Sequence, residues 1–176
     1  IRLRVETLLS LPNDSAHSHS CLEMRKMNSV ERAALSFKEG FNCAQAVLSA
    51  FGPELGLNRD LALKVAGAFG GGMGRQGGTC GAVTGAFMAI GLRCGVARAD
   101  EEAKEKTYRL VKEFTDVFTG RNGSTICREL LRLDISTVQG RERATEKKLF
   151  TTLCPKLVRD AAEIIEQMLR EPRSSS

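Results

Sequence analysis

Apolar residues recur at helical spacing along almost the whole body of the chain, and no alternating pair of strands with a hairpin turn interrupts them. Capping residues, glycines and prolines divide the pattern into segments. The pattern predicts helices at residues 29–38, 43–51, 59–69, 80–93, 101–119, 125–133, 141–150 and 155–169. We therefore expect an all-α fold, a single-domain helical bundle of about six to eight helices.

Neither end of the chain continues this pattern. Residues 1–27 and 171–176 lack helical periodicity, so we expect both to be disordered tails and the first to lie outside the native protein, with Met24 or Met27 as the true start. The apolar run at residues 8–11 is too short for the core of a signal peptide. Three further residues of this tail are interpreted as accidental and not as a metal site: His17, His19 and Cys21.

The charge of the chain is distributed evenly. The net charge is +5, but basic and acidic residues alternate closely, as in residues 141–148. A nucleic-acid-binding face gathers its basic residues in one stripe. Aromatic residues make up only 5% of the chain, which argues against stacking on bases. We therefore expect no nucleic-acid partner.

The longest uncharged run, residues 76–92, contains five glycines. It is shorter than the roughly 20 apolar residues of a membrane span, so we expect no membrane insertion and interpret it as a buried helix. Because the chain shows no export signal, we expect a cytoplasmic location. A reducing compartment keeps cysteines available as thiols, metal ligands or catalytic groups.

Four of the six cysteines lie within one turn of a predicted helix start: Cys43, Cys80, Cys127 and Cys154. Helix N-termini favour anions, so we expect these thiols to have lowered pKa values. If the four helix starts converge, they form a pocket for a metal or an iron–sulfur core. The alternative is that they are ordinary buried residues, since their spacing matches no C-x-x-C or ferredoxin pattern. Cys94 and Cys21 are interpreted as bystanders.

Eleven of the 17 glycines lie between Gly67 and Gly95, which predicts an unusual backbone. Residues 72–77 fit the pattern G-x-G-x-x-G of dinucleotide-binding sites. That site requires a strand before the glycines and another after them, whereas the preceding segment is predicted to be helical and no strand follows, so we reject it. In the next segment, Gly81 and Gly85 belong to small-residue faces that allow close helix packing. We expect this helix to be central and to carry Cys80 into the middle of the bundle.

Four segments together resemble the C_GCAxxG_C_C family of redox-active proteins: GFNCAQAV at residues 40–47, CGAVTG at 80–85, GSTICREL at 123–130, and Cys154-Pro155. The resemblance covers about residues 28–169. It implies an α-helical, four-cysteine redox domain over residues 28–170, with Cys43, Cys80, Cys127 and Cys154 as its site. A related domain in split-Soret cytochrome c is similar to an iron–sulfur carrier, which favours a cluster over a bare dithiol. The chain lacks C-x-x-C-H, so we expect no haem.

Three functions remain open at this point. The leading hypothesis is a redox protein that binds a 2Fe-2S or 4Fe-4S cluster through the four cysteines and passes electrons to an unidentified partner protein, with Arg75 as a tuning or docking group. The alternatives are a metal-free thiol–disulfide redox protein or sensor, and a zinc-binding structural module. A hydrolase or transferase is not expected, because both histidines lie in the N-terminal tail. Homodimerisation is left open.

Overall fold

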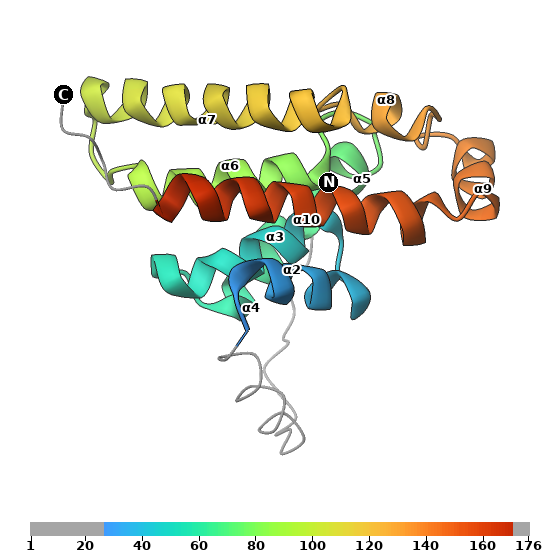
Figure 1. The fold of residues 1–176 in the computed structure, drawn as a ribbon, viewed down its shortest axis with the longest axis horizontal. Coiled ribbons are helices and arrows are strands. Elements are labelled where there is room, and N and C mark those ends of the chain that lie inside the picture. Colours follow the sequence, from blue (N-terminus) through green and yellow to red (C-terminus); the bar gives the residue numbers. More distant parts are fainter. Residues whose placement is uncertain (1–26, 171–176) are drawn as a thin grey trace, which may run out of the picture.

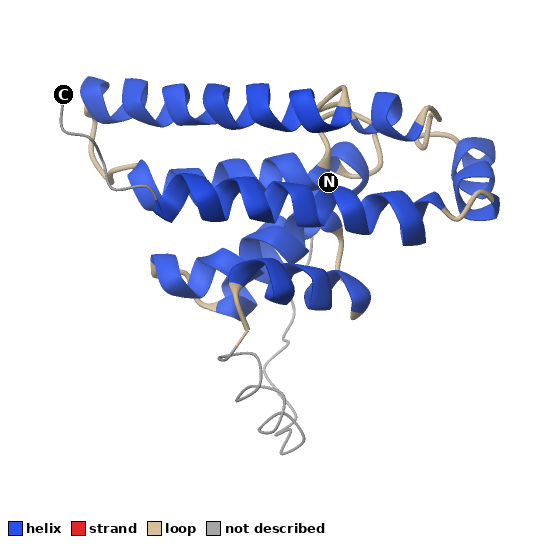
Figure 2. Ribbon diagram, viewed as in Figure 1, coloured by secondary structure: helices blue, strands red, loops and turns tan. Residues whose placement is uncertain are grey.

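The protein, as a computed structural model, is described over residues 27–170 and is all-α (Figures 1 and 2). The N-terminal residues His17, His19, Cys21 and Met24 lie outside the described range. Within that range the right-handed α-helices are α2 (Ser29–Lys38), α3 (Cys43–Phe51), α4 (Arg59–Ala66), α6 (Gly81–Cys94), α7 (Glu101–Asn122), α8 (Cys127–Leu131), α9 (Val138–Glu146) and α10 (Leu149–Arg170). Gly52–Leu55 (η1) and Gly67–Phe69 (η2) are short 3-10 turns, and the short element Gly70–Met73 (α5) is left-handed from Gly71 onwards. The predicted all-α, single-domain fold is confirmed.

Helix α3 lies at the centre of the packing, with its largest contacts to α6, α2 and α4. Helix α10 packs along α2, α6 and α7. In Figure 1, α6, α7 and α10 run lengthwise beside one another, while α2, α3 and α4 gather on one side of them. The largest fully buried side chains include Phe51, Phe114, Phe118, Leu48 and Ile90. Within residues 27–170, no helix combines the length and apolarity needed to cross a membrane.

Asparagine side chains fix the starts of α2, α3 and α4. The Asn28 side chain accepts a hydrogen bond from the Glu31 amide, and Asn58 does the same for Leu61. Asn42 begins α3 by accepting from two amides of the first turn. These bonds satisfy donors that have no partner inside the helix. The observed bounds of α2 and α3 are the predicted ones.

Other predicted boundaries, apart from the start of the last helix, were wrong by up to four residues. Helix α4 ends at Ala66, and the 3-10 turn that follows covers the rest of predicted segment 59–69. Helix α7 continues through Gly120 to Asn122, because the left-handed residue that ends it is Gly123, with φ 84°. Helix α8 covers only five residues, Cys127–Leu131, within predicted segment 125–133. Helix α9 begins earlier than predicted, after the Thr137 cap.

The last helix differs most from its prediction. Helix α10 begins at Leu149 and not at Pro155, so Pro155 and Cys154 lie inside it. The apolar residues before the proline, Leu149, Phe150 and Leu153, continue the helical spacing of the residues after it and pack against the core. That packing outweighs the one hydrogen bond that proline cannot donate. The prediction that Cys154 lies at a helix start is therefore wrong.

Helix α6 approaches α3 so closely at Gly85 that any side chain at this position would introduce strain. A Cβ atom at Gly85 would lie 2.9 Å from the Ala44 carbonyl oxygen and 2.9 Å from the Val47 Cβ. We expect Gly85→Ala to lower the free energy of unfolding by about 2 kcal/mol, measured by urea denaturation. The matched control is Gly91→Ala on the same helix, where nothing lies within 4 Å. This control is expected to gain about 0.5–1 kcal/mol, and equal stability of the two variants would contradict the packing described.

Candidate functional site

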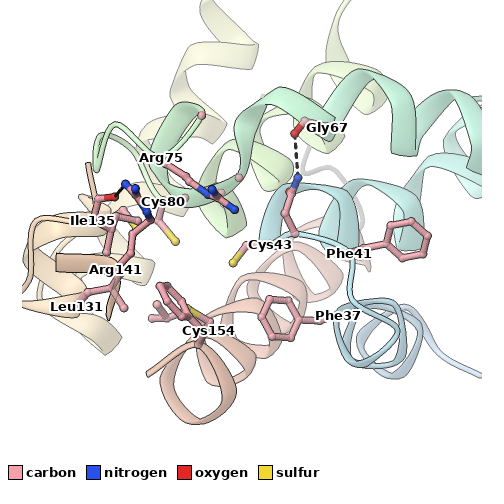
Figure 3. A pocket seen from close by; sticks show the side chains of 18 of the residues that line it. Phe37, Phe41, Cys43, Gly67, Arg75, Cys80, Leu131, Ile135, Arg141 and Cys154 are labelled. Atoms are coloured by element: carbon pink, nitrogen blue, oxygen red, sulfur yellow. Dashed lines mark hydrogen bonds between the residues drawn. The ribbon is translucent and has the colours of Figure 1, made fainter. Parts of the chain in front are cut away.

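Four cysteines line a single cavity of about 770 Å³. They come from the starts of α3, α6 and α8 and from the interior of α10: Cys43, Cys80, Cys127 and Cys154. Figure 3 shows the sulfurs of Cys43, Cys80 and Cys154 turned towards the same space. All four are free thiols; three are buried, and Cys43 is half-buried. The structure thus brings together all four cysteines that the sequence singled out.

Asn42 links the start of α3 to the glycine-rich segment. Besides capping α3, its Nδ2 donates a hydrogen bond of 3.0 Å to the Gly67 carbonyl, drawn in Figure 3. Gly70 packs directly on this side chain, since a Cβ at Gly70 would lie 2.6 Å from the Asn42 Cβ. These contacts fix the position of Cys43, the first residue of α3, at the edge of the cavity.

A short antiparallel bridge, just before α6 and α8, sets Cys80 beside Cys127. The Cys80 amide donates to the Thr125 carbonyl at 2.8 Å, and the Cys127 amide donates to the Gly78 carbonyl at 2.7 Å. Each cysteine is therefore held through its own backbone. Two segments remote in the chain present their thiols side by side because these hydrogen bonds join them.

The glycine after Cys80 allows α6 to meet the start of α3. A Cβ at Gly81 would lie 3.1 Å from the Cys43 Cβ and 3.1 Å from the Ala44 amide nitrogen. Together with the contact at Gly85, this explains the C-G-A-x-x-G spacing physically: the two glycines let α6 pack on the first turns of α3. The close approach brings Cys43 and Cys80 to the same cavity.

Residues 71–75 form a left-handed turn beside the cavity. Their φ angles lie between 62° and 67°. The Gly70 carbonyl accepts hydrogen bonds from the amides of both Gly74 and Arg75. Glycine adopts this conformation freely, but Met73 and Arg75 are L-residues that pay about 1–2 kcal/mol each there. Strain of this kind concentrates at functional sites, and it sets the direction of the Arg75 side chain.

Arg128 links residues 76–77, in the glycine-rich part of the chain, to the start of α8. Its Nε donates to the Gly77 carbonyl at 3.1 Å, and its Nη2 donates to the Gln76 carbonyl at 2.7 Å. The Arg128 backbone amide also donates to Gly77. The guanidinium therefore closes the segment that ends at Cys80 onto the segment that begins at Cys127.

The charged groups that line the cavity are both cationic. They are Arg75 and Arg141, and none of the lining residues, all of which are described, is Asp or Glu. The Nη1 of Arg141 donates to the carbonyls of Ile135 and Ser136 at 3.2 and 3.0 Å. The cavity is therefore suited to negative charge, such as that of several thiolates.

Burial dominates the acidity of two of the thiols. It raises the pKa of Cys80 from 9.0 to about 11, although the amides of Ala82 and Val83 at the start of α6 act in the opposite direction. It also raises the pKa of Cys127 to about 12, with further contributions from the neighbouring thiols. The predicted lowering of these pKa values by helix N-termini is therefore wrong, because desolvation outweighs the helix dipole.

Cys43 and Cys154 form a hydrogen-bonded pair with opposite pKa shifts. The Cys43 thiol donates to the Cys154 sulfur, and this bond and burial raise the pKa of Cys43 well above 9.0. The same hydrogen bond stabilises the Cys154 thiolate and lowers its pKa. Cys154, which lies inside a helix, is thus the one cysteine of the four whose pKa is lowered.

These shifts predict how stability depends on pH in the reduced, metal-free protein. Between about pH 9 and 11 the unfolded chain loses thiol protons that folded Cys80 and Cys127 retain, so the free energy of unfolding falls. Cys154 acts in the opposite direction, but because its pKa is lowered from 9.0, its effect falls mainly below about pH 9. Urea denaturation at about pH 8 and 10.5 should show a smaller fall for Cys80→Ser than for the unsubstituted protein. An equal or larger fall in the free energy of unfolding of Cys80→Ser would contradict the raised pKa of Cys80.

The cavity contains the donor type, cysteine thiols, that binds a metal ion or a cluster as thiolate. Four thiols, two cations and apolar walls surround about 770 Å³. Within residues 27–170, no three side chains of His, Cys, Asp or Glu are already arranged to hold a metal ion. A single zinc ion would need its sulfurs about 3.8 Å apart, whereas an iron–sulfur cluster spaces its ligands more widely.

Fold and cavity together define a helical protein with a four-thiol centre. The chain belongs to the family described as "Putative redox-active protein (C_GCAxxG_C_C)", whose model matches residues 41–168. No curated protein and no solved structure matches the chain. The expected family membership is therefore confirmed, and with it the assignment to a redox-active class.

Some lining residues had no signal in the sequence. Arg141 belongs to a run of alternating charges that predicted only a solvated helix face. Phe37 and Phe150 sit in ordinary amphipathic patterns, yet both line the cavity. Cys94, by contrast, lies at the end of α6 and lines a separate small pocket with Arg93 and Lys106.

Proposed function

We propose that this protein carries electrons by means of an iron–sulfur cluster held by Cys43, Cys80, Cys127 and Cys154. The observation that carries the proposal is that four thiols from remote segments line one cavity. The description of the family as redox-active supports a redox role for this cavity. When bound, such a group supplies one-electron chemistry at potentials set by charge, hydrogen bonding and burial.

The chain's own residues would create the setting for that group. The four cysteines would bind as thiolates, so their protons are released on binding. The bonds to the group must offset the cost of burying the thiolates. Arg75 and Arg141 place positive charge at the cavity, which offsets part of the thiolate charge. Side chains such as Leu131 and Leu157 restrict water around the sulfurs. We expect a protein electron partner, which this chain does not identify.

The test is a reductive titration of anaerobically purified protein, followed by visible absorbance. We expect absorbance that dithionite bleaches and that a mild oxidant restores over several cycles. The restoration matters because it separates a redox centre from adventitious iron, which is stripped on reduction. A preparation with no visible absorbance change on reduction would contradict the proposal.

A second candidate rests on the Cys43–Cys154 pair. The two thiols are hydrogen-bond partners, and the pKa of Cys154 is lowered, which favours its reaction as the nucleophile. A disulfide between them would form with loss of two protons and two electrons to an oxidant such as a protein disulfide. If this pair works alone, the number of free thiols per chain should fall by two on mild oxidation. An unchanged count would remove this candidate.

A further inference from the structure

The cavity is lined by more than its four sulfurs. Its volume of about 770 Å³ lies inside the range of about 300–1,000 Å³ that small-molecule pockets occupy. Much of its wall is aromatic or aliphatic: Phe37, Phe41, Phe150, Leu131, Ile135 and Leu157. Such a wall is suited to the apolar body of an organic molecule, because aromatic and aliphatic side chains make no favourable polar contact with an inorganic ion.

Arg75 is the polar group of this cavity that lacks a partner. Its side chain projects into the space in Figure 3, and it makes no hydrogen bond or ion pair with any described residue. Its stem lies over Gly71, where a Cβ would come within 3.0 Å of the Arg75 Cγ. The left-handed backbone, with φ 67° at Arg75, fixes where this stem leaves the chain. A cation is thus held at the cavity at a cost in backbone strain.

Arg141, in α9, adds a second cation from a segment that is remote from Arg75 in the sequence. Both hydrogen bonds that its side chain donates use Nη1, so Nε and Nη2 have no partner among residues 27–170. No carboxylate lines the cavity to neutralise either guanidinium. A planar guanidinium binds a carboxylate through two parallel hydrogen bonds, which gives both strength and orientation.

We propose that the cavity binds a small organic carboxylate, with its carboxylate on Arg75 and its apolar body against Phe37 and Phe150, beside the four cysteines. This goes beyond the proposed function, because it assigns the cavity a ligand in addition to the cluster. The two guanidinium groups supply the charge recognition, and the aromatic walls select an organic anion over inorganic phosphate.

Benzoate is the probe, titrated calorimetrically into the full chain purified anaerobically. We expect benzoate to bind about tenfold or more tightly than either benzyl alcohol, which lacks the charge, or inorganic phosphate, which lacks the ring. Arg75→Gln should weaken benzoate binding about tenfold, while Arg75→Lys should retain part of it. The control is Arg109→Gln, an exposed arginine of α7 outside the cavity, which should bind benzoate normally.

Equal affinity for benzoate and benzyl alcohol would overturn the inference without any variant. So would tighter binding of phosphate than of benzoate, or binding unaffected by Arg75→Gln in a variant with an unchanged circular dichroism spectrum. Iron content measured on the same samples separates the two proposals. Benzoate binding without iron upholds this inference and counts against the cluster, and iron without benzoate binding does the reverse.

Discussion

Replacing Cys80 by serine is expected to reduce bound iron and visible absorbance to background, whereas Cys94→Ser should leave both at the level of the unsubstituted protein. Cys80 is buried, lines the cavity and begins α6, while Cys94 ends the same helix and lines a different pocket. The substitution removes one of four thiolate ligands, and a serine hydroxyl is a poor replacement at neutral pH. The pair thus compares the same chemical change at the two ends of one helix.

Iron and sulfide content are measured per chain after anaerobic purification of both variants. Circular dichroism controls for folding, because a serine hydroxyl buried at position 80 could cost about 1–3 kcal/mol by itself. Iron retained in folded Cys80→Ser, or lost equally in Cys94→Ser, would exclude the assignment of Cys80 as a ligand.

The second large effect concerns the glycine segment. We expect Gly72→Ala to lower the free energy of unfolding by about 3 kcal/mol, from left-handed strain together with overpacking. Gly72 has φ 67°, and a Cβ there would lie 2.7 Å from the Cys127 Cβ and 2.7 Å from two backbone atoms of Gly78. Neither neighbour can move easily, because the Gly78 carbonyl holds the Cys127 amide.

Gly78→Ala is the matched control for this change. Its φ is not positive, and the atom nearest to an added Cβ, the Gly72 carbonyl oxygen, is 3.4 Å away. We expect a cost below about 1 kcal/mol in urea denaturation. If the two alanine variants were equally stable, the close packing of Gly72 against Cys127 would be refuted.

Local signals in the sequence were sufficient for most of the fold. The asparagines before α3 and α4 act through their own side chains, so their role is visible without any tertiary information. The start of α10 could not be predicted in this way. Pro155 is typical of a first turn, and only the packing of Leu149 and Leu153 on the core shows that the helix starts earlier.

The site was predictable in its residue types and not in its electrostatics. Helix position suggested lowered thiol pKa values, but the burial that raises those of Cys80 and Cys127 depends on tertiary structure. The density of glycines indicated an unusual backbone near residues 70–78. That Met73 and Arg75 share the left-handed turn could not be predicted, since local preference disfavours it in both.

The most direct test of the four-cysteine centre is the iron and acid-labile sulfide content of the unsubstituted protein, determined with its absorption spectrum in the absence of oxygen. We predict a coloured protein that contains iron and sulfide in comparable amounts. A colourless, folded protein with neither iron nor sulfide after anaerobic purification would contradict it.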